Sequence, residues 1–447
     1  MRKRNVLAAL MAGAMAIGSL AGCGGGGNTT TTAAGTENST TAAGESSAAA
    51  DSASGDQVTI KVSLWDYSNT EYYKTMISAF EAKYPNIKVE PVEASAAEYD
   101  DLIQVKLASK EDFDVVFTKG TPALSALVAK GHVMALDDFI AQDNLDLTSY
   151  SGLAEQLQLG GQTYAIPFRK DNNLIFYNKD LFDAAGVAYP EDGMTFDEYR
   201  ELAKQMTSGE GNSKVYGAHV HTWASNANMF PRRTEEYDPF AADKDVLLPY
   251  YQTILAMQNE DKSIMDYGSL KASSTHYSGV FYNQQVAMLQ MGTWFINNLL
   301  ENVDFNWGVC SLPSVSGEGN DKAVGGVTPV SIGAYAKHPE EAWKFIEYVT
   351  GEEGALVLAE TGIVPGYNSD KINEIFDALA SKKEGIPENL SKYIDIDTYV
   401  VEMPMNEKGR EVDKIITEEH DLIMTNSMSA EDGLKEMAER VNEVLGQ

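Results

Sequence analysis

The 447-residue chain has only two cysteines, Cys23 and Cys310, and few basic residues relative to acidic ones. Two cysteines cannot build the disulfide framework of a small secreted domain, so a hydrophobic core must supply the stability. With 34 Lys and Arg against 66 Asp and Glu, the formal net charge is −32. This excess repels polyanions and argues against a nucleic-acid partner, which requires basic patches. Solubility alone would also explain the charge.

Several catalytic motifs are also missing from the sequence. It has no Gly-x-Ser-x-Gly elbow, no His-Glu-x-x-His helix, no Walker loop and no Gly-x-Gly-x-x-Gly after a strand. We therefore expect neither an enzyme nor a bound cofactor. One enzymatic alternative stays open, because paired carboxylates such as Asp66 and Asp171 are the groups that a glycosidase uses as acid and base.

The first 23 residues have the pattern of an export signal. Basic Arg2, Lys3 and Arg4 precede an apolar segment over 6–17, and the segment ends at Leu20-Ala21-Gly22-Cys23. A transmembrane helix is the alternative, but spanning takes about 20 predominantly apolar residues. The last four residues resemble the lipobox of bacterial lipoproteins. That resemblance implies removal of residues 1–22, lipidation of Cys23 with acyl chains such as palmitate, and a location on the extracellular face of the cytoplasmic membrane.

A tether is predicted to follow the lipidated cysteine. Residues 24–57 are almost entirely Gly, Ser, Thr, Ala, Asn, Asp and Glu, with no aromatic or branched apolar side chain to bury. Such a coil would span roughly 30 to 35 Å. We therefore divide the precursor into a signal peptide (1–22), a lipidated linker (23–57) and a folded body that begins near Val58.

The body alternates between strand and helix periodicity. Residues 58–64 alternate as a strand, and 73–80 repeat with the spacing of one helix face. The same switch recurs with a strand over 87–92, a helical run over 99–103, a buried strand over 113–117 and a helix over 123–130 that ends at Gly131. Pro339 marks a further helix start, and Ser429 with Asp432 caps the last helix. Alternating strands and helices predict an α/β fold with a parallel sheet.

Several strings of the body, in this order, resemble one family. They are Leu64-Trp65-Asp66, Phe113 to Phe117, Tyr164 to Pro167, Leu174 to Phe182, Met291 to Trp294 and Gly308 to Pro313. Together with the lipobox, they resemble the extracellular sugar-binding lipoproteins of bacterial ABC transporters, the family of maltose-binding protein. The resemblance covers essentially everything from Val58 onward.

The resemblance implies a two-lobed periplasmic-binding-protein-like fold of type II, with a ligand held between lobes that a hinge connects. By analogy the lobes are discontinuous, with 58–168 plus 311–350 in lobe 1 and 169–310 plus 351–447 in lobe 2. It also implies a monomer that captures a carbohydrate, most simply an oligosaccharide, and delivers it to the permease subunits of an importer. Rival functions are binding of a polyamine or of glycerol phosphate, and a structural or adhesion lipoprotein that would need no hinge.

A sugar site needs flat aromatic surfaces for the C–H faces of the ring and fixed polar groups for its hydroxyls. Trp65 and Asp66 follow the first strand, at the sheet edge where open α/β sheets bind ligands, and Ser68 and Asn69 lie in the same loop. The two oxygens of Asp66 could hold two neighbouring hydroxyls. Core packing is the alternative for Trp65.

Further candidates lie after other strands and at the first crossing between lobes. Lys119 follows the strand over 113–117 and could donate to hydroxyls, unless it is merely solvated. Arg169, Asp171 and Asn172 follow Ile166-Pro167-Phe168, and the resemblance places a cleft carboxylate at Asp171. We include all four as predicted ligand contacts.

The second lobe is predicted to add aromatic contacts. His221 and Trp223 follow a strand that begins near Val215, and Trp294 follows Gly292, which allows close backbone approach. In the resemblance, Trp294 stacks on sugar, and Gly326 with Thr328 belongs to a cleft loop of lobe 1. The family supplies another aromatic residue around 403–406, but here the sequence is Met-Pro-Met-Asn, which weakens any claim for long malto-oligosaccharides. Two histidines, His219 and His221, without a third ligand do not predict a metal site.

Overall fold

The computed structural model describes residues 57–234, 236–317, 322–396 and 398–447. The predicted signal, Cys23 and the linker up to residue 56 lie outside the described residues. The strands are β1 Val58–Trp65, β2 Ile87–Ala94, β3 Val115–Phe117, β4 Gln158–Leu159, β5 Gln162–Thr163, β6 Ile166–Lys170, β7 Asn173–Asn178, β8 Tyr216–His219, β9 Val286–Gly292, β10 Trp307–Ser311, β11 Lys322–Gly325, β12 Val327–Ile332 and β13 Thr398–Val401.

The helices are α1 Glu71–Lys83, α2 Tyr99–Ala108, α3 Thr121–Ala129, α4 Asp137–Asp143, α5 Lys179–Ala185, α6 Phe196–Met206, α7 Ser225–Arg233, α8 Leu248–Asn259, α9 Tyr267–Ser273, α10 Tyr277–Tyr282, α11 Phe295–Asn302, α12 Pro339–Thr350, α13 Glu352–Ala359, α14 Asp370–Ala378, α15 Gly409–Met424 and α16 Ala430–Leu445. The predicted alternation from β1 to α3 is confirmed. Two predicted helix ends are confirmed too. Gly131 has φ 66° after α3, and the Ser429 side chain accepts from the Asp432 N–H at the start of α16.

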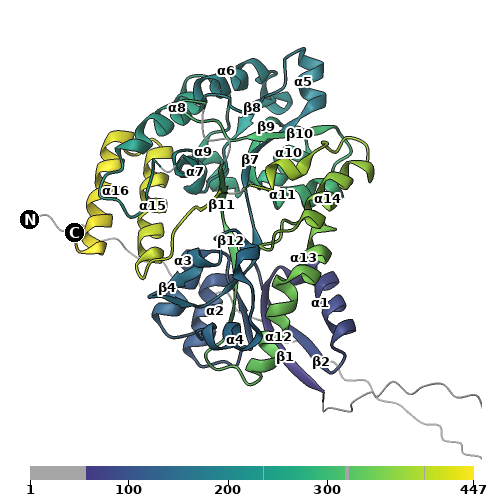
Figure 1. The fold of residues 1–447 in the computed structure, drawn as a ribbon. Helices are drawn as coiled ribbons and strands as arrows, with labels where there is room; N and C mark the ends of the chain where they lie inside the picture. The colour runs from purple at the N-terminus through teal and green to yellow at the C-terminus, as the bar shows by residue number, and fades with distance from the viewer. Residues whose placement is uncertain (1–56, 235, 318–321, 397) are drawn as a thin grey trace, which may run out of the picture. The chain divides into compact units, whose positions relative to one another are not determined.

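Two separate sheets divide the body into two lobes, which confirms the expected fold class (Figure 1). Lobe 1 is built on a five-stranded sheet of order β2-β1-β3-β12-β6. Lobe 2 is built on a four-stranded sheet of order β10-β7-β9-β8. From here on, the two lobes are defined by these sheets.

The prediction of a parallel sheet holds only in part, for β1, β2 and β3 of lobe 1 and for β8 and β9 of lobe 2. Strands β1, β2 and β3 run parallel, but β12 is antiparallel to both β3 and β6, and in lobe 2 β7 is antiparallel to β9 and β10. The sheets are mixed because some strands enter them from the other lobe rather than through a crossover helix. A βαβ crossover forces parallel pairing, and a strand arriving from a hinge does not have that constraint.

Side-chain alternation along β7 explains why helices cover both faces of the lobe 2 sheet. Leu174 and Phe176 belong to one apolar cluster, which includes residues of α10, α11 and α14, while Ile175 and Tyr177 belong to another with residues of α6, α7, α8, α15 and α16. Since successive side chains of a strand point to opposite faces, a fully buried strand needs a helical layer on each side.

The chain passes between the lobes next to the candidate site. Strand β6 of lobe 1 and β7 of lobe 2 are separated only by Asp171 and Asn172, and the segment from β10 to β12 returns to lobe 1. Strands β11 and β13 pair in parallel beside these crossings. A Cβ on Gly325, the last residue of β11, would lie 1.6 Å from the Asp171 carbonyl oxygen, so only glycine allows the crossings to pack this closely.

The lobe boundaries drawn from the resemblance stay a prediction. The boundary at 350/351 separates α12 from α13, two helices that pack against each other, and α13 also contacts α1 of lobe 1 and α14 of lobe 2. Leu358 and Ile363 belong to the apolar cluster of lobe 1. The polypeptide after residue 350 therefore contributes to both lobes.

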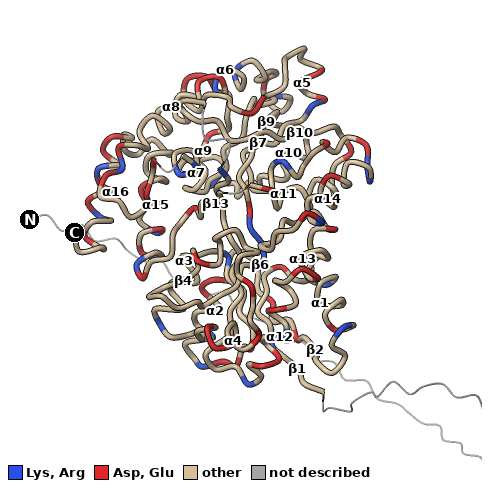
Figure 2. The backbone as a smooth tube through the Cα atoms, in the orientation of Figure 1, with Lys and Arg blue, Asp and Glu red and all other residues tan. Residues whose placement is uncertain are grey.

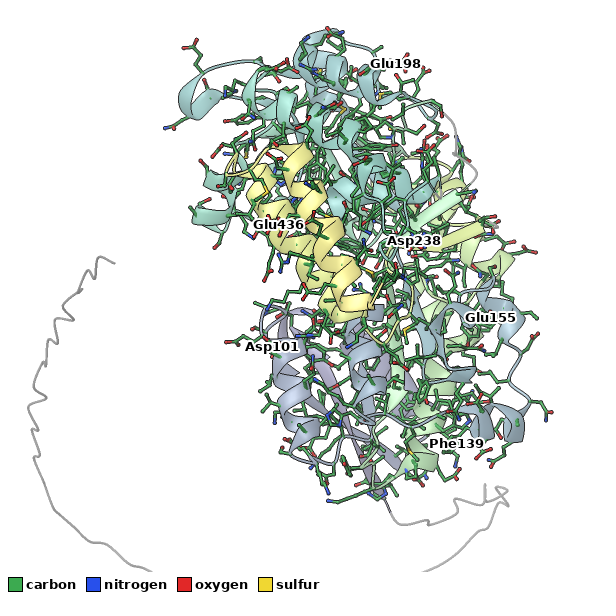
Figure 3. The ribbon with its side chains drawn as sticks, turned by 90° about the vertical axis from the view of Figure 1, so that its left-hand side faces the viewer. Asp101, Phe139, Glu155, Glu198, Asp238 and Glu436 are labelled. Atoms are coloured by element: carbon green, nitrogen blue, oxygen red, sulfur yellow. The ribbon has the colours of Figure 1, made fainter. Side chains whose placement is uncertain are left out.

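The charged residues are spread over both lobes (Figure 2). Lysines and arginines are scattered among acidic positions rather than gathered on one face, as a nucleic-acid surface would require. Helices α15 and α16 lie side by side, and one end of α15 reaches lobe 1, where Arg410 forms an ion pair of 2.7 Å with Asp101 (Figure 3). Among the residues that the structure describes, no helix combines the length and apolar character that a membrane crossing requires.

Candidate functional site

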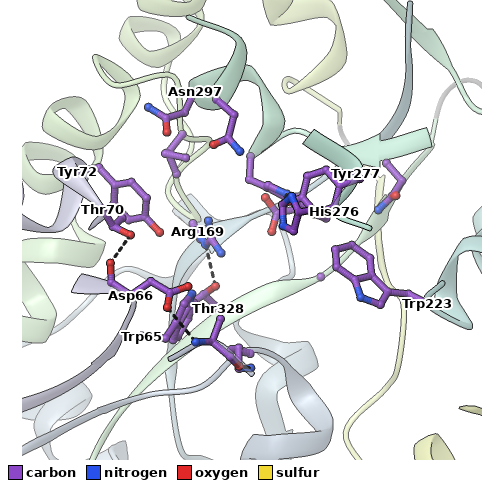
Figure 4. Close-up of a pocket in the computed structure, with 18 of the residues that line it drawn as sticks. Trp65, Asp66, Thr70, Tyr72, Arg169, Trp223, His276, Tyr277, Asn297 and Thr328 are labelled. Atoms are coloured by element: carbon purple, nitrogen blue, oxygen red, sulfur yellow. Dashed lines mark hydrogen bonds between the residues drawn. The ribbon is translucent and has the colours of Figure 1, made fainter. Parts of the chain in front are cut away.

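A large cavity lies between the two lobes, beside the crossings (Figure 4). Its volume is about 940 Å³, within the usual range for small-molecule sites. Ten of the thirteen predicted site residues line it: Trp65, Asp66, Asn69, Lys119, Arg169, Asp171, Trp223, Trp294, Gly326 and Thr328. They come from the ends of β1 and β3, from the crossings and from lobe 2. The sequence pattern therefore located one continuous surface, although contact with a ligand remains a prediction for each residue.

Aromatic rings form opposite walls of this cleft. Trp65 and Tyr72 come from lobe 1, and Trp223 faces them from lobe 2 across the cavity (Figure 4). Trp65 also packs edge-on against Tyr99 of α2, with ring centroids 5.2 Å apart, so core packing accounts for part of this ring, and its contact with a ligand stays a prediction. Trp223 is 41% exposed, which is unusual for so large an apolar side chain. An exposed indole inside a cleft is a surface that a ligand can cover.

Trp294 is fixed against the backbone of Gly292. A Cβ on Gly292 would lie 1.7 Å from the Trp294 ring, so the ring occupies the space of the missing side chain. Its indole N–H donates to the Tyr277 hydroxyl over 3.3 Å, and its ring lies 6.3 Å from that of Trp223. Trp294 is thus a pre-positioned flat surface, and the predicted role of Gly292 in allowing close approach is confirmed.

Arg169 projects from β6 into the cleft between two aromatic rings. Its guanidinium lies 5.9 Å from the ring centroids of both Trp65 and Tyr72, and its Nε donates to the Thr328 hydroxyl over 2.9 Å. Burial alone would lower the pKa of Arg169, but Tyr72 and the Asp171 carboxylate together hold it above its usual value. Arg169 stays charged and is held in place by partners on three sides.

Asp171 is the most deeply placed carboxyl group of the cleft. It is 5% exposed, and its Oδ1 has no hydrogen-bond partner among the described residues. Burial raises the pKa of Asp171 to about 6, against the opposing effects of Arg169 and of the Trp294 backbone N–H. The backbone is held by an N–H donated to the Gly326 carbonyl and by the Tyr399 hydroxyl, which donates to the Asp171 carbonyl. Asp171 therefore brings a rigid, buried carboxyl group to the wall of the cleft.

Two predicted polar contacts are partly occupied within the protein. Asp66 has φ 49°, and its Oδ1 accepts from the Ala96 N–H over 2.9 Å. One oxygen of Asp66 thus also anchors the neighbouring loop, and the predicted contact of this carboxylate with ligand hydroxyls stays a prediction. Lys119 donates to the Ala96 carbonyl and lies 3.5 Å from the Asp100 carboxylate. Lys119 lines the cleft as a positioned cation rather than a solvated one.

Three predicted residues do not line the cavity. Ser68 donates its N–H and hydroxyl to Glu93 on the outside of the loop. The Asn172 side chain donates to the Tyr393 carbonyl and accepts from the Val324 N–H, so it ties the crossings together. His221 is buried and packs edge-on against Trp223 at 4.6 Å and Tyr277 at 5.2 Å. Ser68 and Asn172 shape the cleft's surroundings, and His221 positions Trp223.

Sequence reasoning missed several residues of the cleft. Tyr72, His276, Tyr277 and Glu402 all line it. Tyr72 follows Trp65 by only seven positions, so its place just after the first strand could have predicted it. No feature of the sequence around Tyr277 or Glu402 indicates that they line the cleft. Burial raises the pKa of Glu402 to about 7, with Asp413 and Asp171 adding to the effect. The cavity is therefore lined by two carboxyl groups with raised pKa values, Asp171 and Glu402.

The predicted absence of a metal site concerned His219 and His221. Their rings approach each other, with His219 Nε2 3.5 Å from His221 Nδ1. Burial lowers the pKa of His219 to about 3 and that of His221 to about 4. In the part of the chain that the structure describes, no group of three or more His, Cys, Asp or Glu side chains has the arrangement of a metal centre.

Comparison with known proteins places this geometry in context. The family described as bacterial extracellular solute-binding protein matches residues 67–356. A sugar transporter from Rhizobium etli, solved in an open conformation, is 34% identical with a TM-score of 0.71, and the match covers 86% of this chain and 99% of that one. An ABC substrate-binding protein from Listeria monocytogenes, solved with cycloalternan, has a TM-score of 0.75 at 18% identity and covers 88% of this chain and 100% of that one.

A third relative is the maltotriose-binding protein of Pyrococcus abyssi, 21% identical over 317 residues. That match covers 68% of this chain and 66% of the archaeal protein, slightly less than two thirds of its length. The Listeria and Pyrococcus proteins are binding proteins by their names, and the matched structures share the two-lobed architecture.

Proposed function

The chain belongs to the family of bacterial extracellular solute-binding proteins, and from this membership we propose that it captures an oligosaccharide between its lobes and delivers it to an ABC importer. The observation that carries the proposal is the chemistry of the cleft. Exposed Trp223 and the fixed ring of Trp294 offer flat apolar surfaces, and Asp171, which lines the same cavity, brings a carboxyl group to them. A pyranose presents an apolar face and a rim of donors to match these groups.

The proposed mechanism follows from the placement of the site at the crossings. Ligand docks against one lobe, the other lobe closes over it, and the closed form is what the permease subunits recognise. Because β6 and β7 are separated by only two residues, a hinge rotation at the crossings would change the distance between Trp65 of lobe 1 and Trp223 of lobe 2. Closure is stabilised only by contacts that the ligand makes in the closed state.

A thermal-shift screen with X-ray scattering tests this function. Cello-, malto-, xylo- and manno-oligosaccharides of two to four units, glycerol 3-phosphate and spermidine are each added to the purified body. We expect at least one saccharide to raise the unfolding midpoint, since a ligand that binds only the folded state stabilises it by RT ln(1 + [L]/Kd). The same saccharide is expected to reduce the radius of gyration.

Other results of the same screen would contradict the proposal. Stabilisation by glycerol 3-phosphate or spermidine alone would assign the cleft to a charged solute. Release of new reducing ends with turnover would make the protein a glycan-active enzyme. Stabilisation by no solute and no change in scattering would favour an adhesion lipoprotein without a hinge.

We further propose that Cys23 is lipidated and holds the body on the extracellular face of the cytoplasmic membrane. The support is the sequence from Arg2 to Cys23. Two acyl chains at one terminus are enough to anchor a protein stably to a membrane. In cells fed radiolabelled palmitate, the full chain is expected to carry label and to sediment with membranes, whereas Cys23→Ser is expected to lose both properties. Unchanged labelling of the variant would exclude this site.

A further inference from the structure

The backbone around Glu402, the residue after β13, is held by both lobes. The Glu402 N–H donates to the last carbonyl of β11 over 2.9 Å. The carbonyl of Val401 accepts from Arg232 Nε of α7 in lobe 2 over 3.1 Å. The carbonyl of Met403 accepts from the Thr121 hydroxyl at the start of α3 in lobe 1. Glu402 therefore has a fixed place on a segment that touches both lobes.

The Glu402 side chain lines the cleft without a partner. It is half-buried, and among the described residues no hydrogen bond or ion pair reaches its carboxylate. Its Oε1 lies 3.5 Å from the position that a Cβ on Gly326 would take, so the carboxylate reaches over backbone that itself lines the cleft. The charged groups that act on it most strongly, Asp413 and Asp171, are both acidic. A partly buried carboxylate among like charges is unfavourable unless a cation or a proton compensates it.

Acidic side chains outnumber basic ones in the cleft. The acidic residues that line it are Asp66, Glu71, Asp171, Glu301 and Glu402, and the basic ones are Lys119 and Arg169. Lys119 already lies 3.5 Å from a carboxylate of α2, and Arg169 interacts with Asp171. Burial lowers the pKa of His276, so its imidazole adds no charge near neutral pH. Among the described residues of the cleft, no positive charge is left for Glu402, and a ligand that brings one would supply it.

We propose that the captured saccharide carries a basic amino group and that its ammonium pairs with Glu402, so that the substrate class is an amino sugar or an oligosaccharide that contains one. This inference rests on the proposed function and names its substrate class more narrowly. Glu402 and Trp223 both line the cleft and also a smaller cavity of about 450 Å³ that adjoins it. An indole face and a carboxylate thus border the same space. An aliphatic polyamine uses only the carboxylate, whereas an amino sugar uses both surfaces.

The proton equilibrium of Glu402 supplies a test of this pairing. Burial, with Asp413 and Asp171, raises the pKa of Glu402 to about 7. An ammonium beside the carboxylate favours its charged form, so binding of an amine releases protons and its affinity falls as the pH drops below about 7. Burial raises the pKa values of Asp171 and Asp413 too, and a cation shifts them in the same direction. Arg232 and Tyr399, which also face this segment, keep their protons in this range.

Matched sugars provide the experiment on the wild-type protein. Calorimetry compares glucose, galactose, mannose and cellobiose with the corresponding 2-amino sugars and with the N-acetylated forms of those amines. Acetylation is the control within each series, because it keeps the nitrogen and removes the charge. We expect one amine to bind about tenfold or more tightly than both of its neutral partners, the value of one hydrogen bond to a charged group. Titrations in two buffers of different ionisation enthalpy are expected to show that the amine, and neither neutral partner, releases protons.

Two glutamate variants assign the effect to a residue. Glu402→Gln removes the charge at nearly constant volume and is expected to reduce the preference for the amine to about onefold. Glu407→Gln is the matched control, since it removes the same charge from an exposed position of the same segment that does not line the cleft, and it is expected to keep the preference.

The outcomes separate this inference from the proposed function. Equal binding of amine and neutral sugar without proton release would mean that a protonated Glu402 donates to a hydroxyl, which refutes the ammonium pairing while sugar binding stands. A preference that survives in Glu402→Gln, or binding of neutral saccharides alone, would refute it as well. Binding of spermidine and of no sugar in any series would overturn the proposed function together with the inference.

Discussion

Replacing Trp223 by alanine is expected to weaken binding of the tightest saccharide by about 30-fold or more, with an unfolding midpoint close to that of wild type. A large aromatic side chain at the centre of a binding surface contributes about 2 kcal/mol or more when truncated, which is about 30-fold in Kd. Trp223 lines the cleft and is 41% exposed. Because much of the ring is already in water, its removal costs the ligand more than it costs the fold. Calorimetry and thermal melts of the same preparations measure the two effects.

Tyr335 supplies the control for this substitution. Its side chain is 37% exposed, a value close to that of Trp223, and it does not line the cleft. Tyr335→Ala removes an exposed aromatic ring of lobe 1 and is expected to leave the affinity unchanged. Equal affinity of wild type and Trp223→Ala would show that the exposed indole does not cover the ligand. The aromatic argument for a sugar would then lose its main support.

The local fold could be predicted from the sequence because its signals are local. The alternation over 58–64 and the helical spacing over 73–80 gave β1 and α1, and Ser429 gave the start of α16. Sheet direction could not be predicted in the same way. Strands β12 and β6 are antiparallel neighbours separated by more than 150 residues in sequence, and no periodicity reports on which lobe a strand joins.

The residues of the candidate site could be predicted where their position in the chain, at a strand end or a crossing, is enough to place them in the cleft. Trp65 and Asp66 follow a strand of lobe 1, and Asp171 lies at a crossing, so the fold alone brings them to the cleft. Tyr277 and Glu402 reach the same surface from α10 and from the segment after β13, which is a matter of packing between distant segments. Hydrogen bonds between the site residues and the rest of the protein could not be predicted from the sequence either. The bond from the Ala96 N–H to Asp66 depends on how the loop after β2 folds back, and it uses part of the hydrogen-bonding capacity of the carboxylate.

Replacing Gly292 by alanine is expected to have a still larger effect than the loss of Trp223. The new Cβ would lie 1.7 Å from the Trp294 ring, so the indole has to move. The backbone N–H of Trp294 also favours the ionised form of Asp171, and Gly292 pairs with Asn173 at the end of β9. A shifted indole therefore disturbs the flat surface and the buried acceptor together. We expect at least about a 100-fold loss of affinity, more than 2.7 kcal/mol, and a loss of about 1–3 kcal/mol of stability from overpacking.

The double variant Gly292→Ala/Trp294→Ala separates a specific clash from general damage. If the clash between the added methyl group and the indole is the cause, removing the indole restores part of the stability that Gly292→Ala loses, because the methyl group then has room. Binding is expected to stay weak, since the flat surface itself is gone. Such non-additivity is typical of residues in direct contact. A Gly292→Ala variant that melts and binds like wild type would mean that the ring moves aside freely, and Trp294 would then not be the pre-positioned wall on which the sugar proposal depends.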